Sequence, residues 1–186
     1  MVDLQLGEGV SHPVIIVEYD PIWPVMYEKE RVSILACAGH RIRRLDHIGS
    51  TSVPGLGGKP VVDMLAGVDS AAEADECVQL LESVGYTDVD PCNEDPDWYY
   101  CLGKQRRTEP IGDHMFHLHL ARYPSDFWKK HILFRDYLRT HADVAQDYYE
   151  LKKELASKYR ENRPAYTDAK TEFIESIVHK ASSSNS

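Results

Sequence analysis

The sequence predicts an α+β fold, with a mixed β-sheet core, flanking helices and a C-terminal helical layer. Three observations support this class. Short apolar segments bounded by Gly and Pro alternate with helical patterns up to about residue 123. Beyond Tyr123-Pro124 the apolar spacing is helical as far as residue 181. The 186 residues, 42% of them hydrophobic, are enough to bury the core of one domain.

We therefore expect a single domain over residues 1–186, with a core of about 14–123, C-terminal helices over about 124–181 and a frayed tail at 182–186. Asp20 and Pro21 suit the start of a helix that ends near Ala38, because Asp favours the N-cap and Pro the first turn. The inner face of this helix is expected to carry Met26, Val32 and Leu35.

The other elements follow from spacing. Residues 41–48 alternate loosely and predict a strand, and the apolar run 60–68 predicts a central strand. The segment GSTSVPGLGG between them is too rich in Gly, Ser and Pro for regular structure. Gly85 would end a helix over 71–84. The remaining expected elements are strands at 98–102 and 115–120 and helices at 125–140, 143–160 and 167–181.

The charge distribution leaves room for an anionic ligand. The formal net charge is −9, which disfavours polyanions in general. Residues 60–103 contain eleven Asp or Glu and no Lys or Arg, so positive charge is concentrated elsewhere. Short basic groups stand at 41–44 and 104–107. Positive charge can therefore meet an anion locally on a protein that repels polyanions over the rest of its surface.

The cysteines and the N-terminus indicate a compartment. The four cysteines, Cys37, Cys77, Cys92 and Cys101, have neither CxxC nor zinc-site spacing, which favours free thiols in a reducing environment. The N-terminus lacks the basic end and following apolar run of a signal peptide, and no continuous apolar stretch approaches the length that a membrane-spanning helix requires. We expect a cytoplasmic protein with no membrane partner.

The most informative segment runs from His47 to Asp63. Gly49 allows the backbone to approach a ligand closely, the hydroxyl groups of Ser50, Thr51 and Ser52 follow it, and Lys59 adds a cation. Such a loop can hold an anion, above all a phosphate. Asp63 lies within an apolar strand, so its carboxylate must be paired, hydrogen-bonded or bound to metal. The competing interpretation is a glycine-rich turn beside a structural aspartate.

Two histidines lie close to this carboxylate in the expected sheet. His117 and His119 project from the same face of a strand, because side chains alternate along it. With Asp63 they could form a two-histidine, one-carboxylate site for a divalent metal, Mg or Zn. They could equally act as general base and ligand positioner without metal, or hydrogen-bond Asp63 in a polar core.

Two lysines interrupt apolar faces of the C-terminal helices. Lys152 shares a stripe with Tyr148 and Leu155, and Lys170 shares one with Phe173. A lysine that points inward needs an anionic partner, such as Asp63 or a ligand phosphate, whereas snorkelling to the edge is the ordinary alternative. Together with Arg135, these lysines would form a cationic wall over the sheet.

The segment HIGSTSVPGLGGKPVVDML resembles the hallmark of the GrpB (UPF0157) family, within the nucleotidyltransferase superfamily of DNA polymerase β-like folds. The resemblance continues through HLHL at 117–120, FRDYLR at 134–139 and the spacing of Tyr166, Lys170 and Phe173. In that superfamily a Gly-Ser turn holds nucleotide phosphates and an Asp-x-Asp pair binds divalent metal. The resemblance implies that role for Gly49, Ser50 and Asp63, but Leu65 replaces the second carboxylate.

The resemblance implies a transferase with a nucleotidyltransferase-like core, acting on a nucleotide-like or phosphate-bearing substrate. The expected reaction centre consists of Asp63, His117, His119 and Ser50, with Asp63 and the two histidines as metal ligands if a metal is used. The expected substrate-binding residues are Gly49, Thr51, Ser52, Lys59, Arg135, Lys152 and Lys170.

Two alternatives remain. A fungal branch resembling this family makes arginine-containing cyclodipeptides from aminoacyl-tRNA, which would make tRNA the partner and a carboxylate the ligand of an arginyl group. A non-catalytic module that binds a nucleotide or another anion would explain the loss of the second carboxylate.

Overall fold

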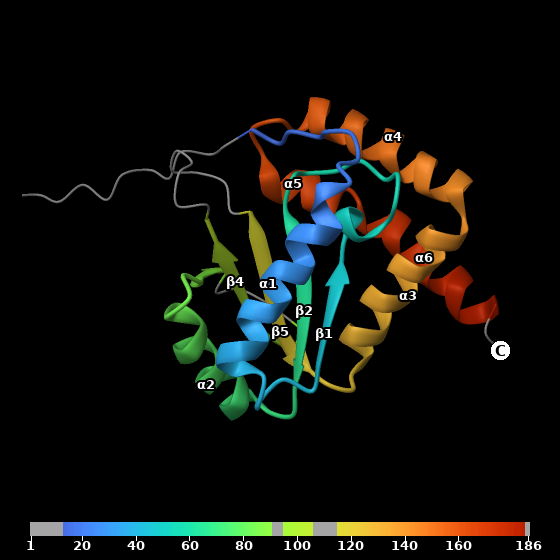
Figure 1. Cartoon of the computed structure of the whole chain (residues 1–186). Helices are drawn as coiled ribbons and strands as arrows, with labels where there is room; N and C mark the ends of the chain where they lie inside the picture. The colour runs from blue at the N-terminus through green and yellow to red at the C-terminus, as the bar shows by residue number, and fades with distance from the viewer. Residues whose placement is uncertain (1–12, 91–94, 106–114, 185–186) are drawn as a thin grey trace, which may run out of the picture.

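The computed structural model describes residues 13–90, 95–105 and 115–184. A five-stranded sheet of order β1-β2-β5-β4-β3 forms the centre of the molecule (Figure 1). β2 and β5 pair in parallel, and the other neighbouring pairs are antiparallel, so the sheet is mixed. The strands are β1 Arg44–Ile48, β2 Val62–Val68, β3 Thr87–Asp90, β4 Trp98–Lys104 and β5 Phe116–Arg122.

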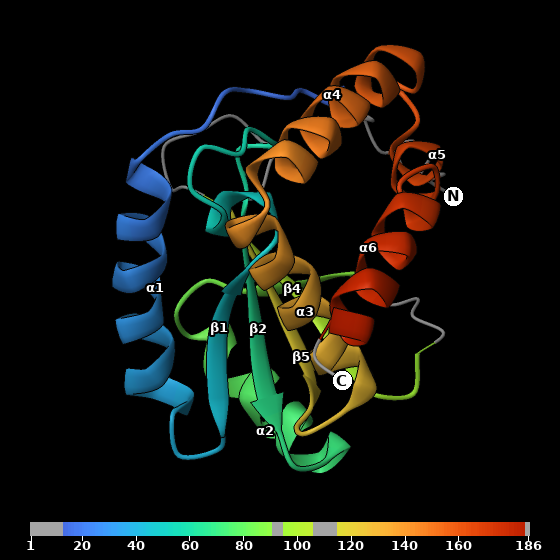
Figure 2. The ribbon, with the colours of Figure 1, turned by 90° about the vertical axis from the view of Figure 1, so that its right-hand side faces the viewer.

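Helices cover both faces of the sheet. Helices α1 and α2 lie on one face, whereas α3 lies on the other, followed outward by α4 and α6 (Figure 2). The α+β class with its helical C-terminal part is thereby confirmed. The helices are α1 Ile22–Ala38, the 3₁₀ helix η1 Ser50–Ser52, α2 Ala71–Glu82, α3 Asp126–Thr140, α4 Ala142–Lys158, α5 Arg163–Asp168 and α6 Thr171–Ser184.

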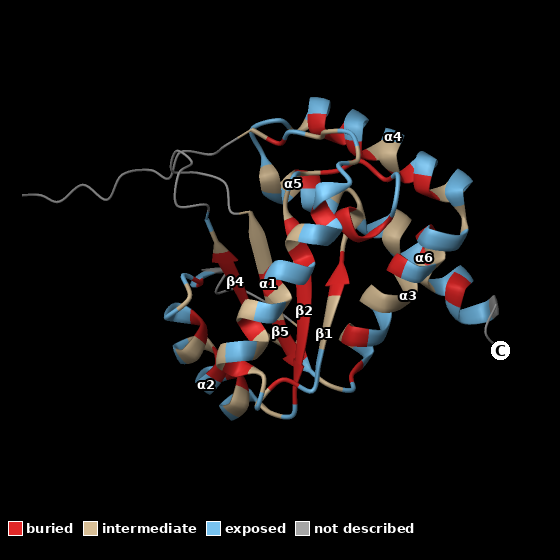
Figure 3. Cartoon of the chain, viewed as in Figure 1, coloured by how far each residue is buried: buried red, intermediate tan, exposed pale blue. Residues whose placement is uncertain are grey.

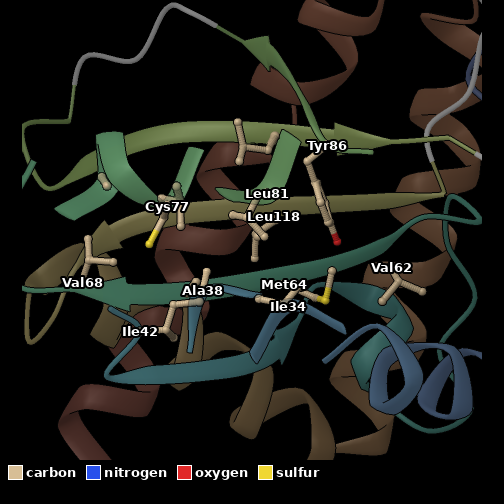
Figure 4. Packing of buried hydrophobic residues seen from close by; sticks show 14 of the residues in the cluster. Ile34, Ala38, Ile42, Val62, Met64, Val68, Cys77, Leu81, Tyr86 and Leu118 are labelled. Carbon is tan, nitrogen blue, oxygen red and sulfur yellow. The ribbon is translucent and has the colours of Figure 1, made fainter. Parts of the chain in front are cut away.

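The main core lies between the sheet and the pair α1–α2. Alternate residues of β2 point into it, and Val62, Met64 and Val68 are fully buried there (Figure 4). Ile34 and Ala38 of α1 and Leu81 of α2 close this layer from the helical side. Because strand side chains alternate, the intervening residues of β2, which include Asp63 and Leu65, face α3 instead.

The opposite face of the sheet carries smaller clusters. Leu65 and Ala121 pack against Trp128 of α3. Val53 and Leu56, from the loop between β1 and β2, pack against Leu138 of α3 and the α4 residues Ala145 and Tyr148. Burial is concentrated along the central strands and on the inward sides of the helices (Figure 3). The glycine-rich loop is therefore held between the sheet and the C-terminal helices.

Helix starts use the residues that favour them. Ser70 and Ser125 cap α2 and α3, each accepting a hydrogen bond from a backbone N–H three residues later. Asp20 accepts from the Ile22 N–H at 2.9 Å, although the helix itself begins at Ile22. No helix in the described part of the chain is long and apolar enough to cross a lipid bilayer.

The inner face expected for the first helix was wrong at Val32, which is 65% exposed. Met26 and Leu35 are partly buried and pack against the edge of the core. The buried face instead carries Trp23, Tyr27, Glu30, Ile34 and Ala38. Large aromatic rings therefore contact the sheet where shorter aliphatic side chains were expected, and Glu30 is buried because Tyr86 and Lys104 hydrogen-bond its carboxylate.

Several boundaries also differ from the sequence expectations. The strand predicted over 41–48 begins at Arg44, and β3 at Thr87–Asp90 was not predicted. The helix predicted over 167–181 is two helices, α5 and α6, and α6 continues to Ser184 rather than fraying from residue 182. The N-terminal segment 1–12, on which the absence of a leader peptide was judged, lies outside the described residues, as do Cys92 and the basic residues Arg106 and Arg107.

Candidate functional site

The register of the sheet brings three predicted residues to one face. Asp63 on β2 lies directly opposite His117 on the parallel strand β5, and His119 follows two residues later on the same side. In the antiparallel pair β1–β2, Ile48 lies opposite Asp63. The turn that follows Ile48 therefore passes beside the Asp63 carboxylate.

Gly49 makes this close approach possible. Its φ of 67° and ψ of −174° lie in a region that L side chains rarely adopt. A Cβ atom at this position would stand 2.6 Å from Oδ2 of Asp63. The glycine is thus required by its backbone conformation and by the neighbouring carboxylate, which confirms that the turn and the acid share one place in the fold.

Asp63 is an ionised carboxylate that solvent still reaches. Burial on its own would raise its pKa, but the hydrogen bond and charge of His117, together with the charges of His119 and Lys59, lower that pKa to about 2. Oδ1 of Asp63 lies 3.4 Å from Nδ1 of His117, and the Asp63 side chain is 31% exposed. A carboxylate in this state stays negatively charged at neutral pH, so it can accept hydrogen bonds from His117 or from a bound substrate and pair with cationic groups.

His119 is a neutral imidazole at physiological pH. Burial lowers its pKa to about 4. Its Nδ1 atom is buried and has no hydrogen-bond partner in the described part of the chain, and its ring lies 5.4 Å from the ring of Trp98. His131, expected in the core, donates from Nδ1 to the Phe127 carbonyl at 2.8 Å and interacts electrostatically with both Asp63 and His119. His114, predicted to belong to a loop, is not among the described residues.

Lys152 reaches this site from α4, as the helical stripe predicts. Only 2% of the residue is exposed. Its Nζ donates to the Ser50 hydroxyl at 2.8 Å and to the Gly57 carbonyl, and it lies 4.7 Å from the centre of the Tyr148 ring. Burial, reinforced by the charge of Lys170, lowers its pKa to about 7.

Lys170 and Lys59 add two more amines around an aromatic ring. Nζ of Lys170 lies 4.4 Å from the centre of the Tyr166 ring, and Nζ of Lys59 lies 5.8 Å from it. Burial and then the charge of Lys59 lower the pKa of Lys170 to about 8, whereas Asp63 acts in the opposite direction. Three lysines therefore act electrostatically on one another or on a single carboxylate, which gives the site a positive excess.

Thr51 and Ser52 use their hydroxyl groups within the loop. Thr51 is 1% exposed, and its hydroxyl forms a 2.9 Å hydrogen bond with Nε2 of His47. Ser52 is 5% exposed and donates to the Gly49 carbonyl at 2.6 Å. The two side chains stabilise the shape of the turn, and Ser50 is the partly exposed residue of the three.

Arg135 is committed to the sheet rather than to an open cationic wall. It is 8% exposed, and Nη1 contacts the Asp46 carboxylate at 3.3 Å and the His47 carbonyl at 3.1 Å, while Nε donates to Asp136 at 2.7 Å. Its neighbour Arg139 donates to the Ser52 carbonyl. Both guanidinium groups therefore brace β1 and the loop against α3.

The residues do not fit a metal centre. No group of three His, Cys, Asp or Glu side chains in the described ranges lies close enough together to hold a metal ion. Asp63, His117 and His119 thus share a face without forming the predicted ligand set. Leu65, at the position of the second carboxylate, is fully buried and offers no oxygen, so two-metal phosphoryl transfer has no support here.

The contacts of the lysine amines with aromatic rings were not predicted, although the sequence places Tyr148 on the stripe of Lys152 and Tyr166 four residues before Lys170. Tyr148 and Tyr166 lie beneath the amines of Lys152 and Lys170, and both rings are buried. The spacing of Tyr148 four residues before Lys152, and of Tyr166 four residues before Lys170, is the signal that could have found them. A hydroxyl-bearing turn, an ionised acid and aromatic-backed amines together define an α+β protein with a polar site between its sheet and its helical layer.

The chain belongs to the GrpB family. A family model described as GrpB protein matches residues 13–180. A crystal structure of the conserved protein GrpB from Enterococcus faecalis is similar with a TM-score of 0.78 and 30% identity, over 90% of this chain and 96% of that chain.

Sequence relatives agree with this membership. A UPF0157 protein of Halalkalibacterium halodurans is 31% identical over 181 residues, which cover 96% of this chain and 89% of that protein. The glutamate-rich protein GrpB of Alkalihalophilus pseudofirmus is 30% identical, with coverages of 90% and 95%. A dephospho-CoA kinase of Mycolicibacterium paratuberculosis is 28% identical, and this chain spans about half of it, 46%.

Proposed function

We propose that the chain is a transferase with a nucleotidyltransferase-like fold that acts on a nucleotide-like, phosphate-bearing substrate. One observation carries the proposal. In the described part of the chain no carboxylate lies within 4.0 Å of the amine of Lys59, Lys152 or Lys170, although the carboxylate of Asp63 acts on Lys152 and Lys170 electrostatically. Amines concentrated in this way and left without ion-pair partners favour a multiply charged anion.

The roles divide between the sheet and the helical layer. Lys59 and Lys170 would bind the anionic group, and the Ser50 hydroxyl, oriented by Lys152, would complete its contacts. His117 would accept the proton of the attacking group, and the ionised carboxylate of Asp63, 3.4 Å from its Nδ1, would orient the ring and stabilise the imidazolium that forms. No step requires the second carboxylate that Leu65 replaces.

The cationic cluster favours this function over the arginine-containing cyclodipeptide alternative. An arginyl guanidinium group would meet three amines and one carboxylate that already pairs with His117. Cyclodipeptides in extracts of an expressing host, lost on Asp63→Asn substitution, would favour the alternative instead. The thiols of Cys37 and Cys77 form no disulfide in the described part of the chain, and on that ground we propose the cytoplasm as the compartment.

The test combines binding with turnover. The melting temperature of the protein is measured against a panel of nucleoside mono-, di- and triphosphates and inorganic phosphate, at low and high salt. A ligand that stabilises the wild type should lose most of its effect with Lys170→Met and at high salt, whereas Lys153→Met should change little, because Lys153 is exposed and pairs with Glu150.

Turnover of the stabilising ligand is then followed by mass spectrometry with candidate acceptors. Asp63→Asn should abolish product formation and retain binding. Binding without turnover in the wild type would make the chain a non-catalytic anion-binding module. Stabilisation that is equal in Lys170→Met would contradict the assignment of the lysine cluster.

A further inference from the structure

We infer that Ser50 is a nucleophile, that Lys152 is its general base, and that Ser50 carries an acyl group taken from a donor with a phosphate-bearing leaving group. This inference rests on the proposed function for the place where the donor's phosphate binds. It goes further by naming the transferred group and the atom that carries it. The geometry of the loop, of the buried amine and of the neighbouring cations points to this role.

The position of Ser50 is that of a side chain presented by a sharp turn. Strand β1 ends at Ile48, Gly49 takes up its positive φ, and Ser50 begins the 3₁₀ helix η1. The backbone therefore turns beside Asp63, and Ser50 is left partly exposed where Thr51 and Ser52 are buried. A nucleophile needs such access to the carbon that it attacks.

Lys152 contacts this hydroxyl directly. The distance from Nζ to Oγ is 2.8 Å, and the second hydrogen bond of Nζ goes to the Gly57 carbonyl. The contact depends on Gly58, because a Cβ atom there would stand 2.8 Å from Cβ of Ser50 and 3.4 Å from Nζ. The loop is thus shaped so that this amine and this hydroxyl touch.

The surroundings of Lys152 favour its neutral form. The residue is 2% exposed, and within the described ranges no carboxylate lies within ion-pair distance of Nζ. A buried amine without a counter-ion loses its proton readily. A neutral amine can donate to Gly57 and still accept the proton of Ser50, which a buried ammonium paired with a carboxylate could not.

The charged groups around Lys152 come from three directions. Lys170, between α5 and α6, lowers its pKa, and Asp63 on β2 raises it. Tyr148 and Tyr149 on its own helix present their rings to it at 4.7 and 5.9 Å. With burial as the largest influence, the pKa of Lys152 is lowered to about 7, which lies in the range where an amine is an effective base.

The reaction uses side chains of this site and two reactants, an acyl donor with a phosphate-bearing leaving group and an amine or hydroxyl acceptor. Oγ of Ser50 bonds to the carbonyl carbon of the donor, and its proton passes to Nζ of Lys152. The bond from that carbon to the phosphate-bearing oxygen breaks, and its electron pair leaves with the oxygen, whose charge Lys59 and Lys170 stabilise. An amine or hydroxyl acceptor then attacks the carbonyl carbon of the Ser50 ester and gives its own proton to His117, which releases it to solvent. The bond from that carbon to Oγ breaks, and Lys152 returns the first proton to Oγ.

A fluorophosphonate probe tests the nucleophile without knowledge of the substrate. The probe bonds its phosphorus to an activated serine and releases fluoride. Intact-mass and peptide analysis of the wild-type protein should show one adduct, located on Ser50, and none with Ser50→Ala. The labelling rate should rise about tenfold per pH unit below pH 7 and level off above it, following deprotonation of Lys152.

Substitutions of Lys152 separate the base from the structural contact. Lys152→Arg keeps hydrogen-bond donors but accepts no proton, and should lower the labelling rate about 10²–10⁴-fold. The exposed neighbour provides the matched control, Lys153→Met, which should label like the wild type. Melting temperatures of all variants verify that each one is folded, and Lys152→Met provides a second variant if the arginine does not fit.

Three outcomes would overturn the inference: a folded wild type that is not labelled at pH 9, an adduct that persists in Ser50→Ala, or a rate that is unchanged in both Lys152 variants. These outcomes leave the proposed function standing, because nucleotide stabilisation does not depend on a covalent adduct. Conversely, labelling of Ser50 in a protein that binds no phosphate-bearing ligand would refute the proposed function and the phosphate-bearing leaving group, but not the nucleophile.

Discussion

Replacement of Gly49 by alanine tests the geometry on which the site depends. The new Cβ atom would lie 2.6 Å from Oδ2 of Asp63, which is too close, and 3.2 and 3.3 Å from the Cβ and Cγ atoms of the same side chain, which is tight. The backbone conformation, φ 67° and ψ −174°, would also have to be held by a residue that disfavours it. We expect both a loss of stability and a displaced carboxylate.

The magnitude follows from these two contributions. A non-glycine residue in this region costs about 1–3 kcal/mol. The contact with Asp63 adds about 1–3 kcal/mol, as overpacking does elsewhere. Gly55 provides a matched control, because its φ is 81° but no atom lies within 4 Å of its added Cβ. Gly55→Ala should therefore show the backbone cost alone, about 1–2 kcal/mol.

Urea denaturation and thermal melting measure the difference, at about 2–4 °C for each kcal/mol in a chain of this size. Gly49→Ala should unfold at clearly lower urea than Gly55→Ala and should lose stabilisation by phosphate-bearing ligands, which Gly55→Ala should keep. Equal destabilisation of the two variants, or full ligand binding by Gly49→Ala, would refute the close approach of the turn to Asp63.

Three further predictions concern charge. The pKa of Asp63 is lowered from 3.8 to about 2, so the ionised carboxylate contributes about 1–2 kcal/mol, after screening, to the free energy of unfolding. This contribution is present above pH 4 and is lost as the pH falls to 2. In acid titration, Asp63→Asn should therefore lose stability less steeply than the wild type. The pKa of Lys152 is lowered from 10.5 to about 7, so between these pH values the unfolded chain binds more protons than the folded one. The free energy of unfolding should therefore rise from pH 7 to 10 more steeply in the wild type than in Lys152→Met. Arg135→Ala should cost about 1–3 kcal/mol, because Asp46 and the His47 carbonyl lose a buried donor while Arg44 still pairs with Asp46. Ligand affinity should be unchanged in the folded fraction, and weakened binding without destabilisation would return Arg135 to the site.

Sequence patterns predicted the elements that depend on local signals. The apolar run of β2, Gly85 after α2 and the helical spacing after Pro124 each determine their element within a few residues. Strand β3 was not predicted, because its sequence TDVD contains only one apolar residue and the strand is formed by pairing with β4. The buried residues of α1 were not all predicted, because the way the helix packs on the sheet, rather than its apolar spacing, determines which side chains are covered.

In the site, strand alternation and helical periodicity were sufficient to predict on which side of its strand or helix a residue lies. They predicted that His117 and His119 share a side of the sheet and that Lys152 points inward. They were insufficient where a side chain has several partners to choose from. Nothing local indicates that Thr51 pairs with His47 or that Arg135 pairs with Asp46, because these partners are fixed by how α3 and the loop pack on β1.

The contact between Ser50 and Lys152 joins residues 102 positions apart. One member lies on the turn that leaves the first strand, and the other on a helix of the C-terminal layer. The ribosome must therefore have added most of the residues before the hydroxyl can meet its amine. The proposed nucleophile and its base are thus brought together only when that helix docks on the turn, so the site is a product of long-range packing rather than of any local segment.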